Sequence, residues 1–412
     1  MNVKLLALGA ALAAVVAPAQ ETIIRNARVI AISGPDQEKA DVRIVDGRIA
    51  EIAPSLPAAP PRTAVIDARG RTLMPAYVLA HTSEGLDRAN EAMDVTPFVS
   101  VLDAVDPTLP FFDNMLRDGV YTVNVMPGDR TVVGGMGRVL RPVGRIVEEM
   151  TIVAEPGLKI SMFPPQGNRA SHLAKLRAVL DDARRHHEAR ELAVDTRPTG
   201  NFAVDLEAMQ IERRKEALVR LVKGRLPAFV SCESSGDVLR ALDLAKEFGL
   251  DLRFVLQPGT WRAAKHLADA KAKVILTADF VAEETDPETG KATRRILPKI
   301  LHDAGVEFAV TTAQTSLGHR YLWYQASLLV RHGVPREVAL KSVTLTPARI
   351  LGLEASRGSI EVGKDADLLL LTDDPLSGRA WVDVGVADGK VVYERVKDRR
   401  LAELLGLGAE TR

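Results

Sequence analysis

Both ends of the chain carry short segments in which apolar and polar residues alternate. From residue 21 to residue 66 the alternation has a period of two, which predicts half-buried strands. Residues 44–49 place Asp46-Gly47 between β-forming residues, and residues 386–391 do the same with Asp388-Gly389. An Asp-Gly pair between strand-forming residues predicts a two-residue hairpin. The matching hairpins predict one small β-domain built from both ends of the chain.

Between these ends, strand-like and helix-like segments alternate, as in a parallel sheet with helical crossovers. Strands are predicted at residues 120–125, 158–162, 228–231, 252–256, 273–277 and 307–311. Helices are predicted at residues 110–118, 171–192, 204–222 and 237–248, the last closed by Gly249. The count approaches eight strand–helix units and predicts a (β/α)8 barrel. A doubly wound open sheet is the alternative.

These patterns divide the chain into parts. Residues 20–72 and 356–400 form the predicted composite β-sandwich, residues 73–355 the barrel and residues 401–412 a C-terminal tail. Residues 1–19 combine Lys4, an apolar run and a small-residue stretch ending at Ala19, which predicts a signal peptide and export to the periplasm or outside the cell. A short N-terminal anchor is the alternative.

Charge and cysteine content add two constraints. Lysine plus arginine and aspartate plus glutamate both number 54, so the charge balance predicts no nucleic-acid partner. Cys232 is the single cysteine, and an internal disulfide is therefore excluded.

Residues 72–85 read Thr-Leu-Met-Pro-Ala-Tyr-Val-Leu-Ala-His-Thr-Ser-Glu-Gly, an apolar run that ends in a lone histidine. Such a run predicts a buried strand that carries polar side chains at its C-terminal end. The segment resembles the first barrel strand of the amidohydrolase superfamily, Met-Pro-Gly-Leu-Ile-Asp-x-His-x-His, whose histidines bind a catalytic metal. Leu79 stands at the aspartate, His81 at the first histidine and Ser83 at the second.

The resemblance continues along the chain. Residues 118–123 and the glycine-rich residues 132–137 are similar to imidazolonepropionase-like amidohydrolases. Residues 339–352 resemble the helix pair after the last barrel strand, and residues 358–368 resemble the return into the β-sandwich. The resemblance implies the superfamily's fold. Activity must be argued from the site itself.

The resemblance also implies that most metal ligands are replaced. The fifth and sixth strands of the family end in histidines, where this chain has Ser231 and Gln257-Pro258. The eighth ends in an aspartate that acts as general base, where this chain has Ala313. The fourth strand of relatives often carries a carboxylated lysine, for which Lys159 is the weak candidate. The alternative for Lys159 is a solvated surface lysine.

The other histidines do not complete a metal site. Six fall in helical stretches and are predicted at surfaces or helix ends: His172, His186, His187, His266, His302 and His332. His319 follows the eighth strand and is a candidate for lining the pocket. The predicted pocket residues are therefore His81, Ser83, Ser231, Gln257, Thr312 and His319.

A rearranged site is the alternative to a lost one. Glu84, Glu233 and Asp279 lie near predicted strand ends with His81, and carboxylates bind zinc or harder cations. Weak candidates for metal ligands are His81, Lys159 and Asp279, and weak catalytic candidates are Glu233, Glu84 and Cys232. For Cys232 a buried, inert thiol is the alternative to a nucleophile.

Two functions follow. The first is a degenerate, non-catalytic amidohydrolase-family protein without a metal or other cofactor. It would bind a small molecule, or form a homo-oligomer or a hetero-oligomer with an active amidohydrolase paralogue. The second is a hydrolase of non-peptide or dipeptide C–N bonds, in amides or cyclic amides, with a rearranged site that uses zinc or another divalent metal. The sequence does not decide between these two functions, and it therefore leaves open whether the protein is an enzyme.

Overall fold

The computed structural model of the chain describes residues 21–61, 63–163, 167–192, 213–313 and 318–406. The predicted signal peptide lies outside these residues, and so does much of the helix predicted at residues 204–222, of which residues 213–222 are helical. Within the described ranges, no helix combines the length and apolar character that crossing a membrane requires.

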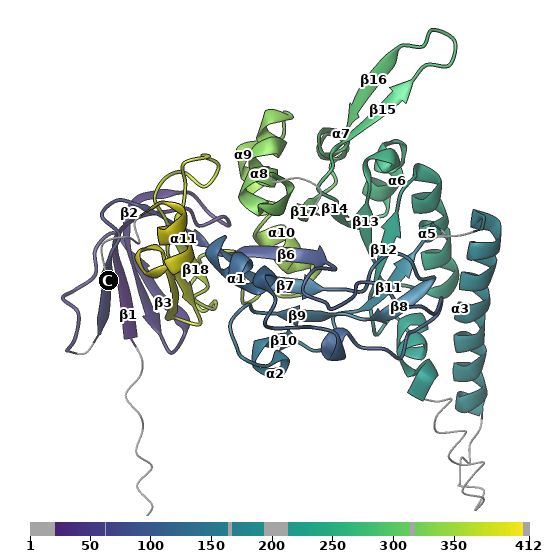
Figure 1. Cartoon of the computed structure of the whole chain (residues 1–412), viewed down its shortest axis with the longest axis horizontal. Helices are drawn as coiled ribbons and strands as arrows, with labels where there is room; N and C mark the ends of the chain where they lie inside the picture. The colour runs from purple at the N-terminus through teal and green to yellow at the C-terminus, as the bar shows by residue number, and fades with distance from the viewer. Residues whose placement is uncertain (1–20, 62, 164–166, 193–212, 314–317, 407–412) are drawn as a thin grey trace, which may run out of the picture.

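A β-sandwich forms from both ends of the chain, as predicted (Figure 1). Its strands run in the order β20-β19-β18-β5-β1-β2-β3, with β4 beside β1. Strand β5 of the N-terminal part pairs antiparallel with β18 of the C-terminal part, and Leu73 lies opposite Leu370. The bounds of the strands are β1 Glu21–Val29, β2 Gln37–Val45, β3 Arg48–Ala53, β4 Ala64–Asp67, β5 Thr72–Pro75, β18 Leu368–Leu371, β19 Val382–Ala387 and β20 Lys390–Glu394.

Both predicted hairpins are confirmed. Asp46 and Gly47 connect β2 to β3, Asp388 and Gly389 connect β19 to β20, and all four residues have positive φ angles between 48° and 80°. The two turns also pack against each other, because a Cβ added to Gly389 would lie 2.9 Å from the Cα of Gly47. Glycine is therefore required in the second hairpin by its backbone angle and by this close approach.

The barrel lies beside the sandwich (Figure 1). Parallel pairing joins β6 to β7 and runs through β11, β12, β13, β14 and β17. In the described residues the strands of the barrel form two separate hydrogen-bonded sheets, one with β6 and β7 and the other from β8 to β17. Strand β8, which follows β7 in the barrel, pairs antiparallel with β11. The bounds are β6 Tyr77–Thr82, β7 Val120–Val125, β8 Val133–Met136, β9 Arg138–Leu140, β10 Thr151–Val153, β11 Leu158–Ser161, β12 Ala228–Cys232, β13 Leu252–Leu256, β14 Lys273–Leu276 and β17 Phe308–Val310.

Helices cover the barrel. The helix predicted at residues 237–248 is confirmed as α5, with a capping box between Ser234 and Asp237 at its start and left-handed Gly249 at its end. The bounds are α1 Pro110–Arg117, α2 Val147–Met150, α3 Arg169–Leu192, α5 Ser235–Phe248, α6 Ala264–Asp269, α7 Leu297–Asp303, α8 Leu322–Arg331, α9 Arg336–Lys341, α10 Leu345–Ile350 and α11 Arg399–Leu404.

Three features differ from the sequence-based expectation. Residues 72–85 form two strands, and the first, β5, belongs to the sandwich sheet, which therefore reaches Pro75. The segment predicted as a C-terminal tail contains helix α11. A two-stranded arm of β15 (Val281–Thr285) and β16 (Ala292–Ile296) projects between β14 and α7 (Figure 1).

A charged network joins the sandwich to the barrel. Asp367, next to the first residue of β18, pairs with the guanidinium groups of Arg357 and Arg141, at 3.1 Å between Asp367 Oδ1 and Arg141 Nη2. Arg357 also pairs with Asp365, and Arg141 with Asp388 in the second hairpin. The side chains of Asp367 and Arg357 are each only 7% exposed. The acidic residues of the segment at residues 358–368 thus hold the two domains together.

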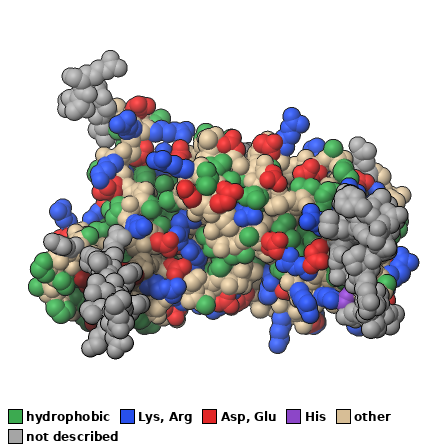
Figure 2. Space-filling view, turned by 90° about the horizontal axis from the view of Figure 1, so that it is seen from below, with side chains coloured by type: hydrophobic (Ala, Val, Ile, Leu, Met, Phe, Trp, Pro, Cys, Tyr) green, Lys and Arg blue, Asp and Glu red, His purple; other side chains and the backbone are tan. Residues whose placement is uncertain are grey.

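Acidic and basic side chains are interspersed over the face of the molecule seen in Figure 2. Exposed pairs such as Arg240 with Asp243 and Lys265 with Asp269 follow the spacing of helix neighbours. The distribution of charge on this face therefore follows the even balance of the whole sequence.

Candidate functional site

A fully buried lysine is at the centre of the candidate site. Lys159 is in strand β11, where Leu158 and Ile160 join the main hydrophobic core. Because side chains alternate along a strand, Lys159 points to the opposite side, into the barrel. A Cβ on Gly134 of β8 would lie 3.0 Å from the Lys159 Cβ, so this glycine leaves room for the lysine. The interpretation of Lys159 as a solvated surface lysine is therefore wrong.

Three polar groups surround the Lys159 ammonium. Its Nζ lies 2.8 Å from His81 Nε2, 2.7 Å from Ser231 Oγ and 2.5 Å from Asp129 Oδ1. Ser231 in turn donates a hydrogen bond of 2.7 Å to Asp129. Because an ammonium only donates, the contact with His81 requires the imidazole to accept at Nε2. The structure thus brings together His81, Lys159 and Ser231 of the predicted set.

Asp129 was not predicted from the sequence. It lies in the loop after β7, which reads Met-Pro-Gly-Asp. The Pro-Gly pair marks the end of the buried strand, and this signal could have identified Asp129 as a polar residue at a strand end. Burial raises the pKa of the Asp129 carboxyl, but the Lys159 ammonium beside it outweighs this effect and holds that pKa at about 2. Asp129 is therefore ionised at neutral pH.

His81 is neutral in this environment. Its side chain lies in the part of β6 where the ladder to β7 is irregular, and it is 7% exposed. Burial, followed by the positive charge of Lys159, lowers the pKa of His81 to about 3. Both effects penalise the imidazolium.

The low pKa of His81 predicts a loss of stability in acid. A histidine whose pKa is lower in the folded state contributes its full stability above about pH 6.5, and that contribution falls as the pH drops. Between pH 6.5 and 5 the loss attributable to His81 is about 2 kcal/mol. Urea unfolding at pH 7, 6 and 5 should show it for the native protein. In the variant His81→Gln the free energy of unfolding should depend less steeply on pH. An equal pH dependence in the two proteins would contradict the low pKa of His81.

Other predicted pocket residues have these positions. Thr312 is buried, and its hydroxyl has no partner among the described residues. Gln257 donates to Glu233 at 3.5 Å, and Ser83 is half-buried just after β6. His319 faces Asp279, with 3.7 Å between its Nδ1 and Oδ1. Asp279 is thus paired away from the lysine cluster.

Cys232 and His172 are both buried. Cys232 is completely buried at the end of β12, and burial raises the pKa of its thiol well above the ordinary value, which disfavours the nucleophilic thiolate. His172, predicted at a surface or a helix end, lies in the first turn of α3 but is only 6% exposed, and its Nε2 lies 2.8 Å from the carbonyl oxygen of Ser161. The start of α3 packs this histidine against the end of β11.

A cavity of about 820 Å³ opens above the cluster at the ends of the strands. Asp129 and Glu233 line it from the barrel side, and Asp94 and Lys175 form an exposed ion pair on its rim. Glu84 lies at a different cavity, with Tyr77 and Phe111. The mouth of the barrel thus offers the Asp129 and Glu233 carboxylates to a ligand, and Glu91 and Asp94 complete the acidic part of the lining.

Comparison with known proteins gives the family of the chain. The model of the amidohydrolase family matches residues 108–392, which is well over half of the sequence. The chain belongs to the amidohydrolase family.

Individual amidohydrolase relatives are distant. An amidohydrolase structure from Thermotoga maritima MSB8 is 27% identical with a TM-score of 0.76, covering 91% of this chain and 100% of that one. Imidazolonepropionase from Sphingopyxis alaskensis is 26% identical over 384 residues, covering 84% of this chain and 90% of that protein. Amidohydrolase tasK from Hapsidospora irregularis is 24% identical over 434 residues, and the match covers 90% of this chain but 43% of tasK.

In this amidohydrolase chain, the described residues contain no group of three or more histidine, cysteine, aspartate or glutamate side chains placed to hold a metal ion. The groups nearest to such an arrangement are His81 and Asp129, and both face the Lys159 ammonium. The barrel mouth is therefore organised around a lysine.

Proposed function

We propose that this amidohydrolase-family protein acts without a metal centre, as a binding protein or as the non-catalytic partner of an active relative. The observation that carries the proposal is the buried Lys159 ammonium in contact with His81, Asp129 and Ser231. A positive charge attached to β11 occupies the space between the side chains that would otherwise be free to coordinate a cation.

The donor set does not fit the family's metal. The ring nitrogen His81 Nε2 already accepts a hydrogen bond from Lys159, and Asp129 accepts from both Lys159 and Ser231. A divalent cation at this point would also be repelled by the ammonium, and the interior's low dielectric strengthens that repulsion. The serine hydroxyl that remains is a weak ligand for zinc.

A carboxylated Lys159 is disfavoured by the same contacts. Carboxylation converts the ammonium into an anion, which would face the ionised Asp129 carboxylate now 2.5 Å from Nζ. Two negative charges so close together oppose each other. The free ammonium is the form that these neighbours stabilise.

The mouth cavity supports a binding role. Its lining includes charged side chains of both signs, among them Asp129, Arg130, Lys175 and Glu233, so a polar ligand or the surface of another protein would find complementary groups there. In the partner version of the proposal, an active amidohydrolase chain would bind at this surface.

Export is part of the proposal. Its support is the N-terminal sequence alone, with Lys4 before the apolar run that ends near Ala19. Fractionation of cells that express the full chain, with N-terminal sequencing of the product, would detect processing near Gln20. An unprocessed protein in the cytoplasm would contradict export.

Metal content is the first test of the proposal. Protein purified without chelator and then incubated with zinc, manganese or iron should retain far less than one ion per chain after gel filtration, measured by mass spectrometry. The metal-free protein should unfold cooperatively at an unchanged temperature when zinc is added. Near-stoichiometric retention of any of these metals would refute the metal-free proposal.

A second candidate function is hydrolysis of amide-like C–N bonds without the family's metal. Asp129 and Glu233 favour it, because both carboxylates line the mouth cavity and an ionised carboxylate can accept a proton from water. A screen of amides, lactams and dipeptides tests it. Turnover that is lost in Glu233→Gln or Asp129→Asn would move this candidate ahead of the binding proposal.

A further inference from the structure

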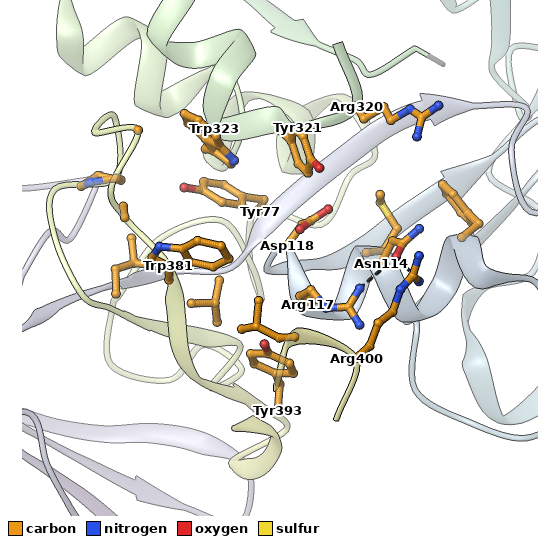
Figure 3. Close-up of a pocket in the computed structure, with 18 of the residues that line it drawn as sticks. Tyr77, Asn114, Arg117, Asp118, Arg320, Tyr321, Trp323, Trp381, Tyr393 and Arg400 are labelled. Atoms are coloured by element: carbon orange, nitrogen blue, oxygen red, sulfur yellow. Dashed lines mark hydrogen bonds between the residues drawn. The ribbon is translucent and has the colours of Figure 1, made fainter. Parts of the chain in front are cut away.

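A second cavity, of about 480 Å³, lies where the barrel meets the sandwich (Figure 3). It is lined from α1, the start of β6, the start of α8 with the residues before it, the end of β18 with the loop that follows, strands β19 and β20, and helix α11. None of its described lining residues also lines the mouth cavity. This junction cavity is therefore separate from the lysine cluster, and what it binds is independent of the proposed function.

Aromatic rings form much of the wall of the junction cavity. Tyr321 and Trp323 stand side by side with ring centroids 6.1 Å apart, and Tyr77 lies close to both in Figure 3. Trp381, from the loop before β19, lies across the cavity and is 45% exposed. Rings on opposite sides of a cavity offer their negative faces to a ligand between them.

One carboxylate faces these rings without a hydrogen-bonding partner of its own. Asp118 directly follows α1 and lines the cavity beside Tyr77 and below Tyr321 in the view of Figure 3. Its side-chain oxygens accept no hydrogen bond from the described part of the chain. Burial raises the pKa of this carboxyl to about 7, although the charge of Arg117 lowers it. A partly buried carboxyl with such a high pKa is stabilised in its ionised form when a cation binds beside it.

Tyr77 supplies a second unsatisfied polar group. Its side chain lines the cavity, is 3% exposed, and has no hydrogen-bonding partner among the described residues. A ligand in this cavity would supply one.

The arginines at the cavity do not neutralise Asp118 by direct pairing. Arg117 donates from Nε to Asp398 at 2.7 Å and from Nη1 to Asn114 at 3.0 Å. Arg320 and Arg400 are exposed, and both lie on the side of the cavity away from Trp381 in Figure 3. The part of the cavity around Tyr77 therefore combines aromatic rings with the Asp118 carboxylate (Figure 3).

We propose that the junction cavity binds a small organic ammonium ion, held between the faces of Trp323, Trp381 and Tyr77 with Asp118 as its counter-ion. Aromatic faces attract ammonium groups through their quadrupoles, and quaternary ammonium ligands are recognised in this way. The cavity is of the size that encloses a small ligand. The carboxylate makes the site selective for a positive charge over a neutral group of the same shape.

Calorimetric titration of the full chain tests this proposal. The probes are choline and benzyltrimethylammonium, and 3,3-dimethylbutan-1-ol is the neutral analogue of choline. At pH 8 at least one of the two cations should bind, and choline should bind at least tenfold more tightly than its neutral analogue. Asp118→Asn and Trp381→Ala should each weaken binding at least tenfold. Asp113→Asn, an exposed acid on the same helix, should leave it unchanged.

The proposal is overturned if neither cation binds, if the neutral analogue binds equally well, or if Asp118→Asn binds like the native protein. Thermal unfolding of each variant must first show a cooperative transition. Should Trp381→Ala fail to fold, Trp381→Phe replaces it and should retain part of the affinity, because the aromatic face is kept.

The pH dependence of binding is a second readout. The charge of these probes is permanent, so a change in affinity reports titration of the protein. Asp118 ionises around pH 7, and binding should be about tenfold weaker at pH 6 than at pH 8. The other titratable groups lining the cavity are one glutamate (Glu84), three arginines and three tyrosines. In Asp118→Asn the affinity should therefore no longer depend on pH. If the pH dependence remains in this variant, another group causes it.

Discussion

Replacing Asp367 by alanine should lower the free energy of unfolding by about 3–5 kcal/mol, the largest effect expected of any single substitution considered for this protein. Asp367 is the shared counter-ion of Arg357 and Arg141, and the side chains of all three are at least 86% buried. Its removal leaves Arg357 with Asp365 and Arg141 with Asp388 as their remaining counter-ions, in a poorly hydrated junction. Removing one partner from a buried charge network costs more than the intact pair contributes.

Urea unfolding followed by circular dichroism measures this loss. Asp243→Ala is the matched control, because Asp243 and its partner Arg240 are each more than half exposed, and a surface pair of this kind contributes about 0.5 kcal/mol. A loss for Asp367→Ala no greater than for Asp243→Ala would show that the network does not hold the domains together. Splitting of the transition into two steps would indicate that the sandwich and the barrel separate.

The second large effect is expected at the lysine cluster. Asp129→Ala should destabilise the fold by about 2–3 kcal/mol, less than for a fully buried pair because the Asp129 side chain is 41% exposed and water can reach the vacated place. Lys159 is fully buried and would lose its one ionised partner. The same change in Asp94, whose partner Lys175 is half exposed, should cost at most about 1 kcal/mol.

A double-variant cycle separates charge from packing at this cluster. Lys159→Met keeps much of the volume of the lysine stem and removes the charge, and such replacements are often neutral or stabilising. Adding Lys159→Met to Asp129→Ala should therefore recover most of the lost stability, which urea unfolding of the four proteins would show. If the two effects simply add, the ion pair between them contributes nothing.

Much of the fold could be predicted from the sequence because its signals are local. The Asp-Gly pairs of both hairpins require positive φ angles, and the Ser234–Asp237 box and Gly249 bound a helix by their own chemistry. The two-stranded arm was not predicted because the charged residues in β15 and β16 hide the alternation, although Asp286 and Gly290 mark its turn. The antiparallel β8 depends on tertiary pairing, which local patterns do not encode.

The candidate site was less predictable, because burial of a charge is decided by its neighbours in space. Lys159 looks like a surface residue in sequence, and only the approach of Asp129, from the loop after β7, and of His81, from β6, makes its burial tolerable. Asp129 lies outside every family motif in the sequence. The roles of Lys159 and Asp129 therefore become visible only through contacts between distant parts of the chain. The same holds for the aromatic rings near Asp118.

The pairing of β5 with β18 sets an order for synthesis of the protein. About 290 residues separate Pro75 from Leu368, and at typical translation rates a ribosome needs about 15–60 s to add them. Throughout that interval β5 lacks its antiparallel neighbour, and an apolar edge of Leu73 and Met74 is open to pairing with other chains. The sandwich sheet of a newly made chain thus stays incomplete at this edge until the C-terminal strands have been synthesised.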